Sequence, residues 1–396
     1  MSIHFPFPAV ERPKLRRGVV CNPLEPPFVF AVGDARSLVP GGVRMPASYE
    51  PLLALADGTR TQAELTEAVN LPADKVAGFF AAMDRALLLD SLAFAAYLAS
   101  PQRLPSCIGV YPEDADDIPA VLDPLFPNGI PDYDPSAPPL RALLVPHMDY
   151  KRGGVVYGAG FAEVARRSQA DVFVIVATSH YSRELFTLTR KDYWTPLGTA
   201  PTDQASVDLL EKHYGEGLFD DPYAHLPEHS VEVEVLLLQH VRAGKPFTVV
   251  PLLVGSFDAC VERSAYPMTH PDIARMVTAL QALDAELGDR ACWIISGDLA
   301  HIGPKFRDPD PVNAEQLAHS RAQDERLLDA VTATDPAAYF TVIHGEQDER
   351  RICGFPPTWL TLTVLALSTG TVHDYRQYVH PEGAESVSFA AASFIR

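Results

Sequence analysis

Short, continuous runs of apolar and β-branched residues recur through the C-terminal two-thirds of the chain. The clearest runs are 143–145, 172–177, 247–254 and 292–295. Segments long enough for helices separate them, for example 158–168 and 203–213. Strands that are apolar at every position and alternate with helices are typical of a sheet covered on both faces. The pattern therefore predicts an α/β domain in which helices flank a central, mostly parallel sheet.

The segment 231–241 fits two interpretations, because its first half alternates between apolar and polar residues like a strand. Its length, and its position after Glu228, His229 and Ser230, favour a helix.

A helical pattern fills residues 46–91. Thr61 and Glu64 have the spacing of a capping box, in which each side chain satisfies a free amide at a helix start. A second helix is indicated by apolar residues at helical spacing: Val76, Phe79, Phe80, Met83 and Leu87. We expect a small helical module within residues 1–100, with an extended arm or a small hairpin over residues 1–45.

Residues 101–140 are rich in Pro and Asp and contain few apolar runs. This composition indicates a linker or an irregular surface segment. We therefore expect three parts: the N-terminal module (1–100), a linker (101–140) and the α/β domain (141–396).

The net charge and the cysteine content exclude several classes of function and location. The chain has 32 Lys and Arg against 51 Asp and Glu, a formal net charge of −19, which repels nucleic acids and anionic membranes. No apolar run is long enough for a membrane span or a signal peptide. The five cysteines are scattered without C-x-x-C spacing. We expect a cytoplasmic protein without nucleic-acid or membrane partners.

Polar residues follow the expected strands. His147 follows the first strand, His180 the second, and Asp298 and His301 the fourth, while His229 precedes the segment 231–241. The carboxyl ends of parallel strands meet at one edge of a sheet, so we expect these side chains to share a pocket. Imidazole is the commonest ligand for intermediate divalent metals. Neutral histidines also serve acid–base chemistry without a metal, and the spacing leaves both readings open.

Cys353 is the cysteine in the most loop-like sequence setting. It follows Arg350 and Arg351, whose charges would favour its thiolate if they lie close to it. The residues alone leave both a chemical and a structural role open.

The order of short motifs in residues 141–396 resembles that of the Memo family. These motifs are PHMDY, TSH, YWTPLG, PEHSVEVEVLLLQ, VVPLLVG, SGDLAHIG, RICG and SVSFAA. The resemblance implies a fold similar to class III extradiol dioxygenases, which are non-haem iron enzymes with a central sheet. Bacterial members encoded beside a radical-SAM protein and an AMMECR1-like protein are called AmmeMemoRadiSam system protein B, so the resemblance implies these two proteins as partners.

The same resemblance assigns roles to the candidate residues. His147 and His180 match the family's two ligand histidines and Cys353 its third ligand, with Fe(II) as the implied metal and copper as the alternative. His301 matches an acid–base histidine, and Asp298 and His229 match pocket residues, which makes these three the candidate catalytic residues.

The chain also departs from the family motifs. Met148 and Asp149 replace the small residues of PHAGY, Tyr181 replaces the second histidine of SHH, and Ala300 replaces a cysteine. An inward-pointing Asp149 would compete with Cys353 as third ligand, whereas an outward, solvated Asp149 would have no such role.

Three functions follow as expectations. The first is a metal-dependent, dioxygenase-like oxidoreductase acting on a peptide or a small chelating substrate. The second is a non-enzymatic binding protein, since residues 46–91 resemble the PqqD-like winged-helix modules of peptide-modification systems; the Val76–Leu87 face would then bind the partner. The third is iron or copper handling, for which a thiolate would favour Cu(I).

Overall fold

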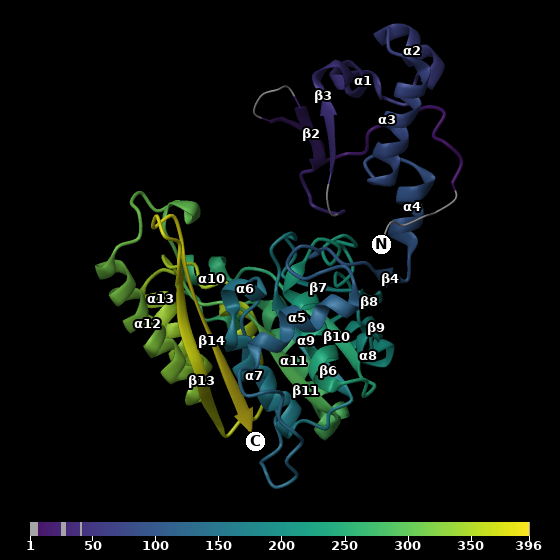
Figure 1. Cartoon of the computed structure of the whole chain (residues 1–396). Coiled ribbons are helices and arrows are strands. Elements are labelled where there is room, and N and C mark those ends of the chain that lie inside the picture. The colour runs from purple at the N-terminus through teal and green to yellow at the C-terminus, as the bar shows by residue number, and fades with distance from the viewer. Residues whose placement is uncertain (1–6, 25–28, 40–41, 396) are drawn as a thin grey trace. The chain divides into compact units, whose positions relative to one another are not determined.

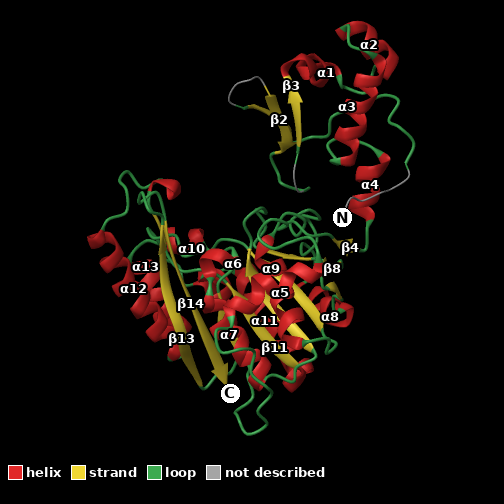
Figure 2. Cartoon of the chain, viewed as in Figure 1, coloured by secondary structure: helices red, strands yellow, loops and turns green. Residues whose placement is uncertain are grey.

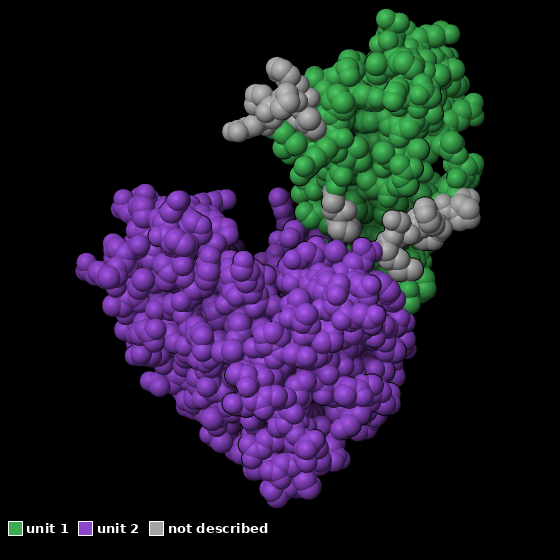
Figure 3. Space-filling view, viewed as in Figure 1, with its two compact units in different colours: residues 1–106 green, residues 107–396 purple. Residues whose placement is uncertain are grey.

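The computed structural model describes residues 7–24, 29–39 and 42–395. The contacts between Cα atoms divide the chain into two compact units, residues 1–106 and 107–396, which are coloured separately in Figure 3. Of the helices in the described residues, none combines the length and the hydropathy that crossing a membrane requires.

The first unit contains an antiparallel sheet of order β1-β2-β3, followed by a series of helices (Figure 2). The hairpin interpretation of the N-terminal segment is confirmed by the antiparallel pairing of β1 and β2; residues 1–6, 25–28 and 40–41 of that segment lie outside the described part. The elements are β1 (Val19–Pro23), β2 (Val29–Asp34), β3 (Val43–Pro46), α1 (Glu50–Leu55), α2 (Gln62–Val69), α3 (Ala73–Arg85), α4 (Leu92–Ala99) and β4 (Gln102–Arg103).

Both predicted helices of the first unit are confirmed. The Glu64 backbone N–H donates to Thr61 Oγ1 at 3.2 Å, and the Thr61 N–H donates to Glu64 Oε2 at 2.7 Å, which is the expected capping box of α2. Val76 and Met83 of α3 are fully buried, and Leu87 is only 6% exposed. The expectation that the Val76–Leu87 face binds a partner is therefore wrong, because this face forms the core of the unit.

The second unit is built on an eight-stranded sheet of order β12-β14-β5-β11-β6-β10-β7, with β13 paired to β14 (Figure 1). Its strands are β5 (Ala142–Val145), β6 (Val172–Thr178), β7 (Phe186–Leu188), β10 (Thr248–Val254), β11 (Ala291–Ser296), β12 (His301–Ile302), β13 (Thr369–Val379) and β14 (Ser386–Ile395). A separate hairpin is formed by β8 (Asp192–Thr195) and β9 (Gly198–Ala200).

The four strands predicted from apolar runs are β5, β6, β10 and β11, and they pair in parallel at the centre of the sheet. The expectation of a mostly parallel sheet needs correction, because β7 is antiparallel to β10 and β14 is antiparallel to β5. The sheet is therefore mixed. Only strands that are buried on both faces gave the continuous apolar signal.

Helices cover both faces of this sheet, as the alternation along β6 shows. Val172, Val174 and Val176 pack with α8, α11, α12, α13 and α14, while Phe173, Ile175 and Ala177 pack with α5, α7 and α9. The prediction of a helix at 231–241 is confirmed by α9. The helices are α5 (Ile118–Leu122), α6 (Tyr150–Gly153), α7 (Val155–Arg167), α8 (Gln204–Tyr214), α9 (His229–Arg242), α10 (Asp258–Glu262), α11 (Pro271–Leu287), α12 (Ala314–Thr332), α13 (Pro336–Gly345) and α14 (Phe355–Val364).

Residues 107–140 lie within the segment expected to be a linker, and in the structure they are part of the second unit. Ile118 and Leu122 of α5 are fully buried in the core cluster that contains α9. The Cys107 backbone N–H donates to Glu232 of α9 at 3.0 Å, and the Tyr111 hydroxyl donates to the same carboxylate. These hydrogen bonds hold residues 107–111, at the start of the unit, against α9.

Candidate metal centre

The histidines expected to meet do lie together, at the carboxyl edge of the parallel strands. His147 follows β5, His180 follows β6, and His229 is the first residue of α9. The ring centroid of His147 lies 5.0 Å from that of His180 and 5.3 Å from that of His229. The His180 and His229 rings stack with their centroids 4.8 Å apart. The convergence predicted from the sequence is therefore confirmed for these three histidines.

Two groups of potential metal ligands share His147. One group is His147, His180 and His229, and the other is His147, Asp298 and Cys353; within each group the ligand atoms lie within 4.8 Å of one another. The structure thus brings together five of the six residues singled out from the sequence, with His147 common to both groups.

The hydrogen bonds of His147 determine which of its ring nitrogens carries the proton. The Ser296 hydroxyl donates to the Ser230 carbonyl at 2.7 Å, so its oxygen accepts from His147 Nδ1 at 3.3 Å. Nε2 is then the bare nitrogen, and Cys353 Sγ lies 3.3 Å from it. A buried imidazole with an occupied Nδ1 and a free Nε2 is prepared to bind a metal.

Glu228 is the functional residue that the sequence analysis missed. Its side chain is completely buried, and its Oε1 lies 2.9 Å from His180 Nδ1 and 3.3 Å from His229 Nδ1. The residue caps α9 by accepting from the Ser230 N–H at 3.2 Å. A carboxylate directly before a histidine at an expected helix start was the available signal.

Two glycines bring Cys353 close to the end of β11. A Cβ added to Gly297 would lie 2.4 Å from the Gly354 Cα, and one added to Gly354 would lie 2.6 Å from the Asp298 carbonyl oxygen. This close packing lets the Gly354 N–H donate to that oxygen at 2.8 Å. The loop before α14 therefore holds the Cys353 thiol beside His147.

His301 lies at the start of β12, and its Nδ1 faces two backbone carbonyls. These are Leu299 O at 3.1 Å and Arg351 O at 3.0 Å, both of which can only accept, so Nδ1 carries the proton and Nε2 is the basic atom. The Phe306 ring packs edge-on against the imidazole with a centroid distance of 5.0 Å. These contacts fix the orientation of the His301 ring and leave Nε2 as its proton-accepting atom.

Asp149 takes neither of the two arrangements considered from the sequence. It caps α6 by accepting from the Arg152 N–H at 3.0 Å, and its carboxylate also forms an ion pair with the Arg152 guanidinium. Of the two candidates for a third ligand, Cys353 is the one grouped with His147 among the described residues. Two other residues at which the chain departs from the family motifs differ in exposure: Met148 is buried, whereas Tyr181 is 46% exposed.

The pKa shifts divide these residues into two kinds. Burial, reinforced by the neighbouring histidines, holds the pKa of His147 well below its usual value, and burial lowers the pKa of His301 to about 4. Burial alone would lower the pKa of His180, but the Glu228 carboxylate outweighs it and raises that pKa. Burial would raise the pKa of Glu228, yet His180 and His229 hold it well below its usual value. His180 and His229 therefore lie beside a charged carboxylate, whereas His147 and His301 are held in their neutral forms.

Burial also raises the pKa values of the two acidic groups beside His147, Asp298 and Cys353. Burial raises the pKa of Asp298 to about 6, and the backbone N–H of His147, which donates to Asp298 Oδ1 at 3.2 Å, partly opposes this shift. Burial and the nearby Asp298 carboxylate raise the pKa of the Cys353 thiol well above its usual value. Without a metal, Cys353 is thus a neutral thiol beside the bare Nε2 of His147.

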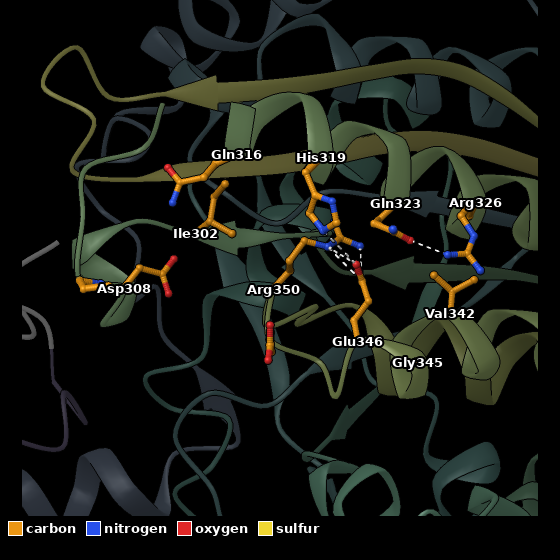
Figure 4. A pocket seen from close by; sticks show the side chains of 12 residues that line it. Ile302, Asp308, Gln316, His319, Gln323, Arg326, Val342, Gly345, Glu346 and Arg350 are labelled. Atoms are coloured by element: carbon orange, nitrogen blue, oxygen red, sulfur yellow. Dashed lines mark hydrogen bonds and ion pairs between the residues drawn. The ribbon is translucent and has the colours of Figure 1, made fainter. Parts of the chain in front are cut away.

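A separate hollow of about 560 Å³ lies between α12, α13 and the loop that follows α13 (Figure 4). Arg350 lines it together with Glu346 and His319, and its guanidinium bonds to the Glu346 carboxylate at 2.8 Å. The backbone carbonyl of Arg350 accepts from the His301 N–H at 2.7 Å. Arg350 therefore connects the wall of this hollow to the backbone of the histidine site.

Comparison with known proteins places this site in a family. Residues 103–395 match the model of the family described as Memo-like protein. A MEMO1 family protein of Aquifex aeolicus is 25% identical over 90% of this chain and 94% of its own length. One from Methanococcoides burtonii is 30% identical over 56% of this chain and 72% of its own length. A solved structure of an uncharacterised Escherichia coli K12 protein matches 65% of this chain and all of its own, with 14% identity and a TM-score of 0.37. The chain belongs to the Memo-like family.

Proposed function

We propose that the protein is a metal-dependent oxidoreductase of the non-haem iron type, in which His147, His180 and Cys353 hold the metal. The observation that carries the proposal is the state of the two imidazoles. Each is bonded at Nδ1, to Ser296 and to Glu228, and in its neutral form each therefore has an Nε2 lone pair available. Two imidazoles and a thiol are donors that suit iron and copper.

The proposed ligands come from both of the groups that share His147. His147 Nε2 and Cys353 Sγ are already 3.3 Å apart, and His180 belongs to the other group that contains His147. Bound iron would supply redox chemistry toward O₂ at the coordination positions that three protein ligands leave open. A site of three histidines, with His229 in place of Cys353, is the second candidate for holding the metal.

The remaining residues of the site supply acid–base groups. His301, neutral at pH 7 and fixed through Nδ1, accepts a proton at Nε2. Asp298, with its raised pKa, is suited to hold or release a proton near neutral pH. His229, about one-third exposed, orients a peptide or a small chelating substrate at the entrance.

We further propose a dioxygenase-like architecture for the second unit and a PqqD-like role for the first. The parallel centre of the mixed sheet, with helices on both faces, supports the first proposal. The sheet β1-β2-β3 followed by α1 to α4 supports the second. Iron or copper handling is the alternative function, favoured by the thiol of Cys353 beside His147.

Elemental analysis of anaerobically purified full-length protein tests the metal proposal. We expect iron or copper near one equivalent in the wild type, and its loss in His147→Ala, His180→Ala and Cys353→Ala. Cys260→Ala removes a buried cysteine of the core and is the matched control, so its metal content should stay unchanged. His229→Ala decides between the two ligand sets.

The His301→Ala variant separates an enzyme from a metal carrier. An enzyme should retain its metal in this variant and lose its reaction with O₂, whereas a carrier should be unaffected. A wild-type protein that takes up neither iron nor copper after anaerobic reconstitution would contradict the proposal.

A further inference from the structure

The carboxylate of Glu228 is surrounded by N–H groups. Its Oε2 accepts from the His180 backbone N–H at 2.7 Å. Its Oε1 faces His180 Nδ1 at 2.9 Å, His229 Nδ1 at 3.3 Å and the Ser230 N–H at 3.2 Å. The side chain is completely buried, whereas the His180 and His229 rings are 32% and 33% exposed. One buried acceptor therefore supports two histidines that a ligand can reach.

An ionised carboxylate can only accept hydrogen bonds. Each imidazole bonded to it must therefore carry its proton on Nδ1, and in the neutral ring Nε2 is left bare. Glu228 imposes this tautomer on His180 and His229 at once. The two rings stack at 4.8 Å with 29° between their planes, which is the arrangement expected of rings fastened to a common point.

We propose that Glu228 is the positioning residue of the metal centre: it fixes the tautomer and the orientation of His180 and His229 together, so that both rings offer a bare Nε2. This inference rests on the proposed metal-dependent function. Carboxylates behind metal-binding histidines raise ligand basicity and fix the ring orientation. Here a single carboxylate does so for one proposed ligand and for the histidine beside it.

Replacement of Glu228 by Gln gives a sharp test, because glutamine has the same shape but a different hydrogen-bonding character. In either orientation its amide NH₂ faces an N–H group that the carboxylate oxygen now satisfies. With the NH₂ group at the position of Oε1, an imidazole relieves the conflict by accepting at Nδ1, which moves its proton to Nε2 and blocks the ligand atom. With the NH₂ group at the position of Oε2, the conflict is with the His180 backbone N–H, and the segment that carries His180 has to move. We therefore expect Glu228→Gln to impair metal binding although it removes no ligand.

The first measurement is the ring tautomer of the histidines, by ¹⁵N NMR of metal-free full-length protein at mildly alkaline pH. In the wild type, His180 and His229 should be protonated at Nδ1. In Glu228→Gln, either at least one ring should be protonated at Nε2, or both tautomers should be kept and the His180 backbone amide should lose its hydrogen bond. The second measurement is iron affinity by chelator competition, which should fall by about 10- to 100-fold. Glu232→Gln is the matched control, because Glu232 is also fully buried on α9 and accepts from Cys107 and Tyr111.

Unchanged tautomers and unchanged iron affinity in Glu228→Gln would overturn the inference, as would an equal loss in Glu232→Gln. If Glu228→Gln does not fold, Glu228→Asp replaces it: the shorter carboxylate should keep both tautomers and still weaken iron binding, and a change of tautomer there would count against the inference. The NMR measurement needs no metal. A wild type without metal would therefore refute the proposed function while leaving the role of Glu228 open to direct test.

Discussion

The two halves of the histidine site are built on different physical principles. His180 and His229 are bonded to the buried carboxylate of Glu228, whereas His147 and His301 are bonded to neutral groups, a hydroxyl and two carbonyls. The pKa of His180 is raised by its carboxylate, while burial lowers the pKa of His147 and brings that of His301 to about 4. The same residue type is thus made more basic on one side and held neutral on the other, according to the group bonded to Nδ1.

This comparison predicts the largest change in stability for removal of the partly buried imidazole of His301. Because its pKa is about 4 in the folded protein and near 6.5 when unfolded, the unfolded state binds more protons between these values. Stability is therefore fully present above pH 6.5 and falls as the pH drops toward 4, by about 3 kcal/mol for this group. In His301→Gln this loss should be absent, as measured by denaturant unfolding across that range.

The matched control is His319→Gln, since the His319 side chain is 65% exposed. This variant should show the same acid-induced loss of stability as the wild type. If His301→Gln follows the wild-type curve as well, His301 is not held neutral by burial.

A smaller effect is expected from Gly354→Ala. The added Cβ would meet the Asp298 carbonyl oxygen, and the loop that carries Cys353 would have to move away from β11. We expect the free energy of unfolding to fall by about 2 kcal/mol, with reduced metal content. Gly345→Ala is the control, because a Cβ there meets nothing within 4 Å and should change neither measurement.

The smallest effect is expected from Ser296→Ala, which removes the neutral partner of His147. The Ser230 carbonyl loses its donor and His147 Nδ1 loses its acceptor, at a cost of about 1 kcal/mol in unfolding free energy. Since a hydroxyl constrains the ring less than a carboxylate, iron affinity should fall less than in Glu228→Gln. A larger fall in iron affinity in Ser296→Ala than in Glu228→Gln would contradict this expectation.

The sequence predicted the parallel centre of the sheet well, because β5, β6, β10 and β11 are apolar at nearly every position. It did not predict β14, whose residues are mainly Ser and Ala and become buried through pairing with β5 and β13 and packing against helices. Small residues carry little hydrophobic signal in a single sequence. The mixed character of the sheet therefore depends on tertiary contacts.

The convergence of His147, His180 and Asp298 was predictable because parallel strands end at one edge. The inward direction of Glu228 was not predictable, since glutamate side chains are usually solvated and rarely fully buried. Asp149 and Arg152 have the spacing that joins them across one turn, and the structure uses that pairing. The positions of these residues along the sequence thus predicted where the site lies, whereas its hydrogen bonds become known only from the structure.

The pairing of β5 has a consequence for folding kinetics. β5, the strand that leads to His147, lies between β11 and β14 in the sheet. A strand near the start of the unit therefore pairs with β14, the last strand of the chain. Pairings between such distant segments fold slowly, because a long loop must close before the contact stabilises it. During synthesis, β5 keeps an open edge until β14 has emerged, and an open edge is a site of aberrant association. We therefore expect the histidine site to assemble late, and a chain that ends before β14 to aggregate.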